Sequence, residues 1–223
     1  MSVLEGPRAG PAMGEAGSLV ILLHGYGADG ADLIGLAQPL APHLPRTAFR
    51  APNAPEPCRV NPMGRQWFPI SWIDGSAEAE MFAGMERAVG VLDRHITEAM
   101  AEEGVGPQET LVVGFSQGTM MALHVVPRRE AALAGIVGFS GRLYQAERVP
   151  GEALSQPPVL LVHGDMDDVV PVQHLEEARA GLAAAGFEVT THVSRGTGHG
   201  IAPDGLGLAL GFMQARLGVA ATG

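Results

Sequence analysis

Cysteine is almost absent from this sequence, which has only Cys58 among its 223 residues. An intrachain disulfide needs two cysteines, so none can form, and the composition does not imply an oxidising compartment. A metal site rich in thiolates is excluded for the same reason, and the eight histidines do not cluster at ligand spacing. We therefore expect no metal ion.

Long apolar runs are also missing. No stretch approaches the length that crosses a membrane, so we expect no stable membrane insertion. Residues 1–17 are rich in Gly, Ala and Pro and lack the apolar core of a signal peptide. We expect a cytoplasmic protein in which residues 1–17 form a flexible tail and residues 18–223 form one domain.

Positive charge is scarce, with 14 Lys plus Arg against 24 Asp plus Glu and a formal net charge of −10 at pH 7. Such a balance disfavours binding to the phosphate backbone of nucleic acid or to an anionic membrane surface. We expect no nucleic-acid partner. The acidic excess says little about a small-molecule substrate, because a solvated acidic surface accounts for it.

Short apolar runs typical of buried strands do recur along the chain. They lie at residues 19–23, 47–51, 110–113, 134–139, 159–162 and 188–193. Helix-like segments separate most of them, and the clearest begins near Ala77 and ends at Gly104. This alternation predicts an α/β fold with a mostly parallel central sheet and helices on both faces. Prolines exclude regular structure from residues 52–75, an irregular stretch of a length that is often functional.

A sharp strand-to-helix turn is predicted at Gly114-Phe115-Ser116-Gln117-Gly118, which has the pattern G-x-S-x-G. Glycine is needed two residues before and two after the apex, because a side chain there would collide with the strand or the helix. Such a turn lifts the serine Oγ out of the sheet toward a cleft. Ser116 is therefore a candidate nucleophile.

A nucleophilic serine needs a base, and the base needs an orienting carboxylate. His199 lies in a glycine-rich loop between the last predicted strand and the last helix, where its imidazole can reach back over the sheet edge. We predict that His199 is the base. The carboxylate should follow another strand, and Asp165, Asp167 and Asp168 all follow the run at 159–162. The residues alone do not separate Asp167 from Asp168, and either gives the Ser-Asp-His chain order of α/β-hydrolases.

An acyl-transfer site also needs hydrogen-bond donors for the oxyanion. The residue after the nucleophile supplies one, so the backbone N–H of Gln117 is the first candidate. The glycine-rich loop over residues 24–30 follows an early strand, and glycines let its backbone approach a substrate. The N–H of Tyr26 is the second candidate.

Taken together, these motifs resemble the phospholipase/carboxylesterase family of α/β-hydrolases, which includes small bacterial carboxylesterases and acyl-protein thioesterases. The matching motifs are Leu23-His24-Gly25-x-Gly27, Pro52-Asn53-Ala54-Pro55, Trp67-Phe68, Gly114-Phe115-Ser116-Gln117-Gly118, Gly138-Phe139-Ser140-Gly141, His163-Gly164-x-x-Asp167-x-Val169-Val170-Pro171 and Gly198-His199. They extend over nearly the whole chain.

The resemblance implies that Asp167 is the catalytic acid and that Tyr26 and Gln117 supply the oxyanion donors. It also implies that Trp67 and Phe68 line the substrate pocket, although they could equally be aromatic anchors of their loop. The chain departs from the family pattern at Tyr26, where leucine is frequent, and likewise at Pro69 and Asp168. Family members often form dimers, so a homodimer is one expectation.

These features predict a serine carboxylesterase that acts on small-molecule esters of short to medium acyl chain, without a cofactor. His199 takes the proton of Ser116, Asp167 orients His199, and water releases the acid from an acyl-enzyme. One alternative is an acyl-thioesterase or lysophospholipase that acts on longer acyl chains. Another is a hydrolase-fold binding protein without turnover.

Overall fold

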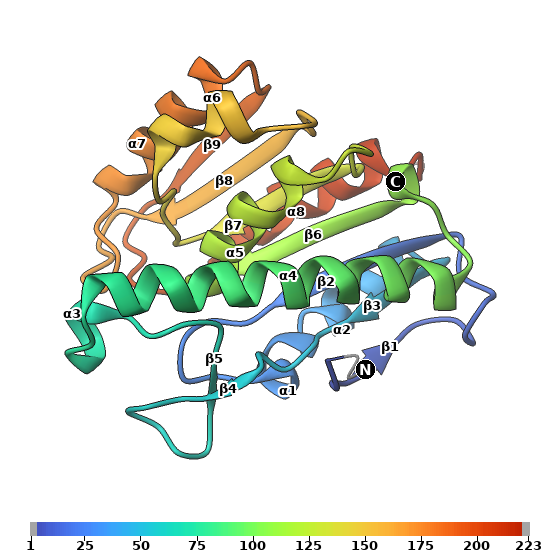
Figure 1. The fold of residues 1–223 in the computed structure, drawn as a ribbon. Coiled ribbons are helices and arrows are strands. Elements are labelled where there is room, and N and C mark those ends of the chain that lie inside the picture. Colours follow the sequence, from blue (N-terminus) through green and yellow to red (C-terminus); the bar gives the residue numbers. More distant parts are fainter. Residues whose placement is uncertain (1–3, 220–223) are drawn as a thin grey trace.

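A seven-stranded sheet with the order β1-β3-β2-β6-β7-β8-β9 forms the centre of the computed structural model, which describes residues 4–219 (Figure 1). All neighbouring strands are parallel except β1, which runs antiparallel to β3. The predicted α/β-hydrolase fold with a mostly parallel sheet is confirmed. The strands are β1 (Arg8–Ala9), β2 (Ser18–Leu23), β3 (Thr47–Arg50), β6 (Thr110–Phe115), β7 (Gly135–Phe139), β8 (Val159–Gly164) and β9 (Val189–Ser194).

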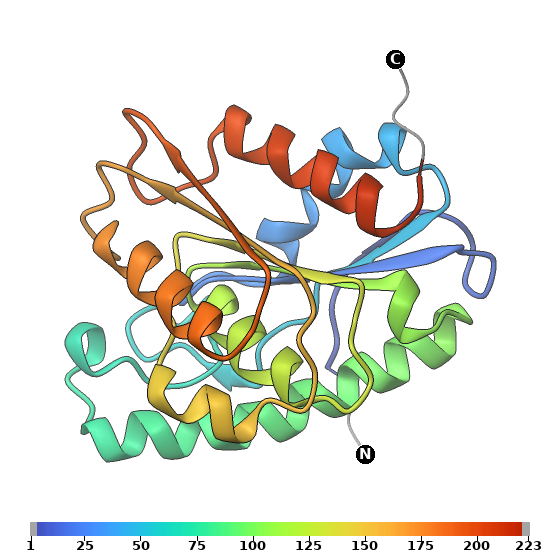
Figure 2. The ribbon, with the colours of Figure 1, turned by 90° about the horizontal axis from the view of Figure 1, so that it is seen from above.

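Helices cover both faces of the sheet (Figure 2). One face is covered by α4 (Glu78–Glu103), α5 (Gln117–Val125), α6 (Val149–Glu152) and α7 (Gln173–Ala184). The other is covered by α1 (Gly30–Ile34), α2 (Ala37–Leu40) and α8 (Pro203–Arg216). Short 3₁₀ turns lie at Ala41–His43, Pro107–Glu109, Val126–Arg128 and Ala146–Arg148. Within residues 4–219, every helix falls short of the length or the apolar character that a membrane crossing requires.

Strand β2 shows why the sheet needs two helical layers. Its apolar residues are completely buried, and successive side chains point to opposite faces. Leu19, Ile21 and Leu23 pack into the core beneath α4 and α5, whereas Val20 and Leu22 pack beneath α2 and α8. A continuous apolar run thus predicts a strand with both faces covered, as in parallel sheets generally.

The segment over residues 52–75 contains more regular structure than we expected. It holds a two-stranded ladder of β4 (Glu56–Pro57) and β5 (Arg65–Gln66), followed by the short helix α3 (Ser71–Asp74). The expectation that prolines exclude regular structure here was wrong in this respect. Proline lacks an N–H but keeps its carbonyl, so Pro57 can stand in a ladder that has only two strands.

Part of the expected flexible tail pairs with the sheet. Arg8 and Ala9 form the edge strand β1 beside β3, and the Arg8 guanidinium contacts Glu103 at the end of α4. Residues 1–3 of that tail lie outside the described part of the chain, as do residues 220–223. No signal for β1 was visible in the sequence, because two residues are too few for a strand period to show.

Candidate active site

Ser116 stands at the apex of the turn between β6 and α5, with φ 53° and ψ −115°. This left-handed backbone is strained for a serine, and strain of this kind is often found at functional sites. The two motif glycines permit it. A Cβ on Gly114 would lie 2.4 Å from the carbonyl carbon of Gly118, and a Cβ on Gly118 would lie 1.9 Å from the oxygen of Leu23.

His199 and Asp167 lie within hydrogen-bond distance, with 2.8 Å between His199 Nδ1 and Asp167 Oδ2. The other carboxylate oxygen, Oδ1, accepts the N–H groups of Val169 at 3.0 Å and Val170 at 2.8 Å. An ionised carboxylate only accepts, so Nδ1 carries the hydrogen and Nε2 keeps its lone pair. This is the tautomer that a general base requires. Asp168, the competing carboxylate, is exposed.

The Asp167 carboxylate is ionised in this environment. Burial raises its pKa, but the hydrogen bonds from the Val170 amide and from His199 lower it by more in total, and the net pKa lies below the ordinary value. The side chain is completely buried. A buried negative charge beside Nδ1 favours any positive charge that develops on the imidazole.

Backbone and side-chain hydrogen bonds hold the loop that carries His199. Asp165 Oδ1 accepts the N–H of Gly196 at 2.6 Å, and the N–H of Met166 donates to Thr197 at 2.9 Å. The His199 ring lies against Phe115, with 5.0 Å between ring centroids. The imidazole is thereby positioned beside the residue that precedes Ser116. Ser116, Asp167 and His199 follow the carboxyl ends of β6, β8 and β9, which lie at one edge of the sheet.

The loop of Tyr26 packs directly against the serine turn. A Cβ on Gly25 would lie 3.3 Å from the Ser116 Cβ, so the backbone approaches as closely as glycine allows. The N–H of Gly27 donates to Arg65 and that of Ala28 donates to Gly25. Within the described residues, the Tyr26 N–H therefore has no acceptor. The N–H of Gln117, in the first turn of α5, has none in this part of the chain either.

Tyr26 also joins this loop to α3 through its hydroxyl, which donates to Asp74 Oδ2 at 2.9 Å. Burial and this hydrogen bond raise the pKa of the Tyr26 phenol, so it remains protonated. The frequent leucine of the family could not make such a contact.

The side chain of Gln117 has a role that the motif does not reveal, because its position is an x in G-x-S-x-G. Its Oε1 accepts the N–H of Trp67 at 2.9 Å, and its Nε2 donates to the carbonyl of Phe68 at 2.8 Å. Trp67 Nε1 donates to the His24 carbonyl at 3.0 Å. Trp67 and Phe68 are completely buried, so in this structure both anchor their loop behind the site.

Two further motif histidines hold loops at the sheet edge. His24 Nε2 accepts the N–H of Ala54 at 3.0 Å, and His163 Nε2 donates to the Val170 carbonyl at 2.7 Å. Burial lowers the pKa of both rings, which keeps them neutral. His163 also lies 3.3 Å from Asp167 Oδ2. Their position directly after strands was visible in the sequence, but their partners were not.

A cavity of about 310 Å³ lies beside the Asp167 loop. Trp72 of α3, Arg142, and the segment from Asp168 to Pro171 line it together with His174. No group of three His, Cys, Asp or Glu side chains in residues 4–219 is placed to hold a metal ion.

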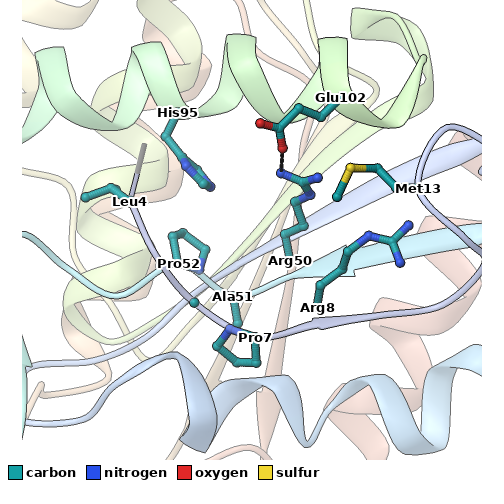
Figure 3. Close-up of a pocket in the computed structure, with 10 residues that line it drawn as sticks. Leu4, Pro7, Arg8, Met13, Arg50, Ala51, Pro52, His95 and Glu102 are labelled. Carbon is teal, nitrogen blue, oxygen red and sulfur yellow. Dashed lines mark hydrogen bonds and ion pairs between the residues drawn. The ribbon is translucent and has the colours of Figure 1, made fainter. Parts of the chain in front are cut away.

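A second cavity, of about 160 Å³, lies away from these residues between α4 and the strands β1 and β3 (Figure 3). His95 and Glu102 reach into it from α4, and Arg50 faces them from β3. The ring nitrogens of His95 are buried and find no partner in the described part of the chain. None of its lining residues comes from the serine turn or from the loops that carry Asp167 and His199, so we do not assign the chemistry to it.

A strained serine and a histidine–aspartate pair at one sheet edge form the arrangement expected of a serine hydrolase with this fold. The model of the Phospholipase/Carboxylesterase family matches residues 10–217, and the chain therefore belongs to this family.

Named relatives agree with this assignment. The chain is 27% identical over 199 residues to the esterase YpfH of Escherichia coli, covering 89% of this chain and 83% of YpfH. It is 30% identical over 207 residues to acyl-protein thioesterase 1 of Eremothecium gossypii, covering 88% and 87%. The crystal structure of esterase PE8 matches with a TM-score of 0.91 and 45% identity, covering 97% of this chain and 100% of PE8. The chain is a carboxylic ester hydrolase.

Proposed function

We propose that this protein is a serine carboxylesterase in which Ser116, His199 and Asp167 form the catalytic triad. The observation that carries the proposal is the hydrogen bond from His199 Nδ1 to Asp167, which leaves Nε2 as a base beside the serine turn. His199 takes the proton as Ser116 Oγ attacks the ester carbonyl. The N–H groups of Tyr26 and Gln117 hold the oxyanion of the tetrahedral intermediate.

Collapse of this intermediate breaks the bond to the alcohol, which leaves with the proton that His199 received. Water then attacks the acyl-enzyme, with His199 again as base, and the acid is released. Asp167 keeps its charge throughout and stabilises the imidazolium, which agrees with its lowered pKa. No step requires a cofactor.

Replacing Ser116 by alanine tests the proposal directly. We expect Ser116→Ala to lose essentially all ester hydrolysis while its thermal unfolding stays close to that of the parent, because only one oxygen atom is removed. A fluorophosphonate probe should label the parent protein at Ser116 and leave the variant unlabelled. Labelling at another residue, or turnover by the purified variant, would show that the nucleophile lies elsewhere. A hydrolase-fold binding protein without turnover would not react at all.

We further propose short to medium acyl chains as substrates, because the cavity beside Asp167 is small and is partly lined by polar groups. The alternative function, hydrolysis of thioesters with longer acyl chains, is supported by the names of relatives such as acyl-protein thioesterase 1. A series of p-nitrophenyl esters and matched thioesters of increasing chain length separates the two. A maximum of kcat/KM at long thioesters would favour the alternative.

A further inference from the structure

We propose that Arg142 forms a subsite for a carboxylate group of the ester substrate, in the cavity beside the Asp167 loop. This inference rests on the proposed function, because it assigns the substrate class of the same site.

The cavity borders the proposed reaction centre: Ser116 and His199 do not line it, but its walls come from segments that are held against the proposed catalytic groups. Val169 and Val170 both line it, and their N–H groups bind the Asp167 carboxylate. Arg142 follows Gly141, where a Cβ would lie 3.0 Å from the Ser116 carbonyl oxygen. Trp72 comes from α3, which lies at the end of the sheet where the loop after β8 also runs (Figure 1).

Arg142 has no carboxylate partner in the described part of the chain, although most arginines of this protein do form ion pairs. Its Nε is buried and has no hydrogen-bond partner within residues 4–219. The guanidinium instead lies over two aromatic rings, 4.7 Å from the centroid of Tyr144 and 5.6 Å from that of Trp72. Ring faces hold the planar group in place without using its N–H donors.

The other charged groups at the cavity leave this cation available. His174 is engaged by Glu177, with 2.6 Å between Nδ1 and Oε2. Asp168 lines the same cavity but forms no ion pair with Arg142. It would therefore repel a bound anion without neutralising the guanidinium. The sequence contains no lysine, so a permanently charged side chain that binds an anion in this protein must be an arginine. A fixed fork of N–H donors in a cavity of this size suits a carboxylate.

The experiment compares matched esters that differ by one carboxylate. The first pair places the carboxylate on the acyl side and consists of monoethyl adipate and ethyl hexanoate. The second places it on the alcohol side and consists of the butyrate ester of ω-hydroxyhexanoate and hexyl butyrate. We expect the parent enzyme to prefer the carboxylate member of at least one pair, by about tenfold or more in kcat/KM, since charge-assisted hydrogen bonds are strong.

Variants separate recognition from packing. Arg142→Met keeps an apolar stem against Trp72 and Tyr144 but removes the charge, and it should abolish the preference mainly through KM. Arg142→Lys should retain part of the preference, whereas Asp168→Asn should increase it. Arg94→Met removes the same charge from the exposed surface of α4 and should leave the preference unchanged.

A parent enzyme without a preference in either pair, or an Arg142→Met variant that keeps the preference, would overturn the subsite. If Arg142→Met does not fold, as thermal unfolding would reveal, the responses of Arg142→Lys and Asp168→Asn decide the question in its place. Failure of the proposed function would look different, because neither neutral ester would then be hydrolysed in a Ser116-dependent way.

Discussion

Two buried carboxylates, Asp167 at the sheet edge and Glu103 at the end of α4, show how similar burial can lead to different roles. Both side chains are completely buried, and the pKa of each lies below its ordinary value. Burial alone would raise both values, so hydrogen bonds and charges lower them. The two carboxylates differ in the groups that supply those bonds.

Glu103 is neutralised by permanent cations. Arg8 donates to both of its oxygens at 2.8 and 2.7 Å, and Arg50 Nε donates at 2.6 Å. Asp167 instead accepts two backbone amides and one imidazole, none of which carries a fixed charge. Its charge therefore remains to stabilise an imidazolium on His199. The partners of a buried carboxylate therefore indicate its role better than its burial does.

The largest effect should come from Asp167→Asn. The amide can donate toward Nδ1 and so favour the wrong tautomer of His199, and we expect kcat to fall by roughly 10⁴-fold. Stability should change little by comparison. Hydrolysis of a neutral ester and urea unfolding measure the two quantities.

The control for that variant is Asp168→Asn, which alters an exposed neighbour and should lose far less activity on the same neutral ester. A larger loss for Asp168→Asn than for Asp167→Asn would show that the triad contains the other carboxylate.

Glu103→Gln should lower stability strongly and leave activity nearly unchanged, the reverse of Asp167→Asn. It leaves the Arg8 guanidinium without its buried partner, so we expect the free energy of unfolding to fall by about 3 kcal/mol. The rate of ester hydrolysis should stay within about twofold of the parent, because Glu103 is remote from the serine turn.

Glu102→Gln is the matched control. Glu102 pairs with Arg50 but is half exposed, and its replacement should cost about 1 kcal/mol or less. Equal losses of stability for the two variants would show that burial does not set the strength of these ion pairs.

The last effect concerns pH and two buried histidines, His95 beside the Glu103 network and His124 in α5. Burial, and then the nearby Arg50, lower the pKa of His95 to about 4, and burial lowers that of His124 to about 4 as well. The unfolded chain, with a histidine pKa of about 6.5, binds protons first as the pH falls. Stability should therefore be complete above about pH 6.5 and decline toward about pH 4, by about 2 kcal/mol for each histidine.

Urea unfolding at about pH 7 and about pH 4.5 measures this decline. His95→Gln and His124→Gln should each reduce the difference between the two pH values, whatever they do to stability at neutral pH. An unchanged difference in both variants would mean that the acid sensitivity comes from carboxylates alone.

Much of the fold could be predicted from local pattern. Every apolar run proposed as a strand is one, and the helix expected from Ala77 to Gly104 is α4, with Gly104 in the left-handed conformation at its end. These hydrophobic patterns indicate which residues are buried, and they can be read from short stretches of sequence. The edge strand β1 and the β4–β5 ladder were missed because each strand has only two residues and is fixed by its partner.

The candidate site was predictable in part for a related reason. Ser116, Asp167 and His199 each follow a strand of a parallel sheet, and the carboxyl ends of such strands meet at one edge. Their motifs therefore predict proximity. The buried amide of Gln117 that holds Trp67 and Phe68 could not be predicted, because its partners lie about fifty residues away.

The α/β layering, the glycine-framed serine turn and the order of the three candidate catalytic residues follow from the sequence alone, because they depend on residue type and short-range geometry. The tertiary structure was needed to show the contact between Asp167 and His199, which the family resemblance had only implied, the two arginines that hold Glu103, and the lack of a carboxylate partner for Arg142 within residues 4–219. Each depends on which distant segments come within a few ångströms. Hydrogen bonds and charge pairing act at that range, and local sequence does not encode it.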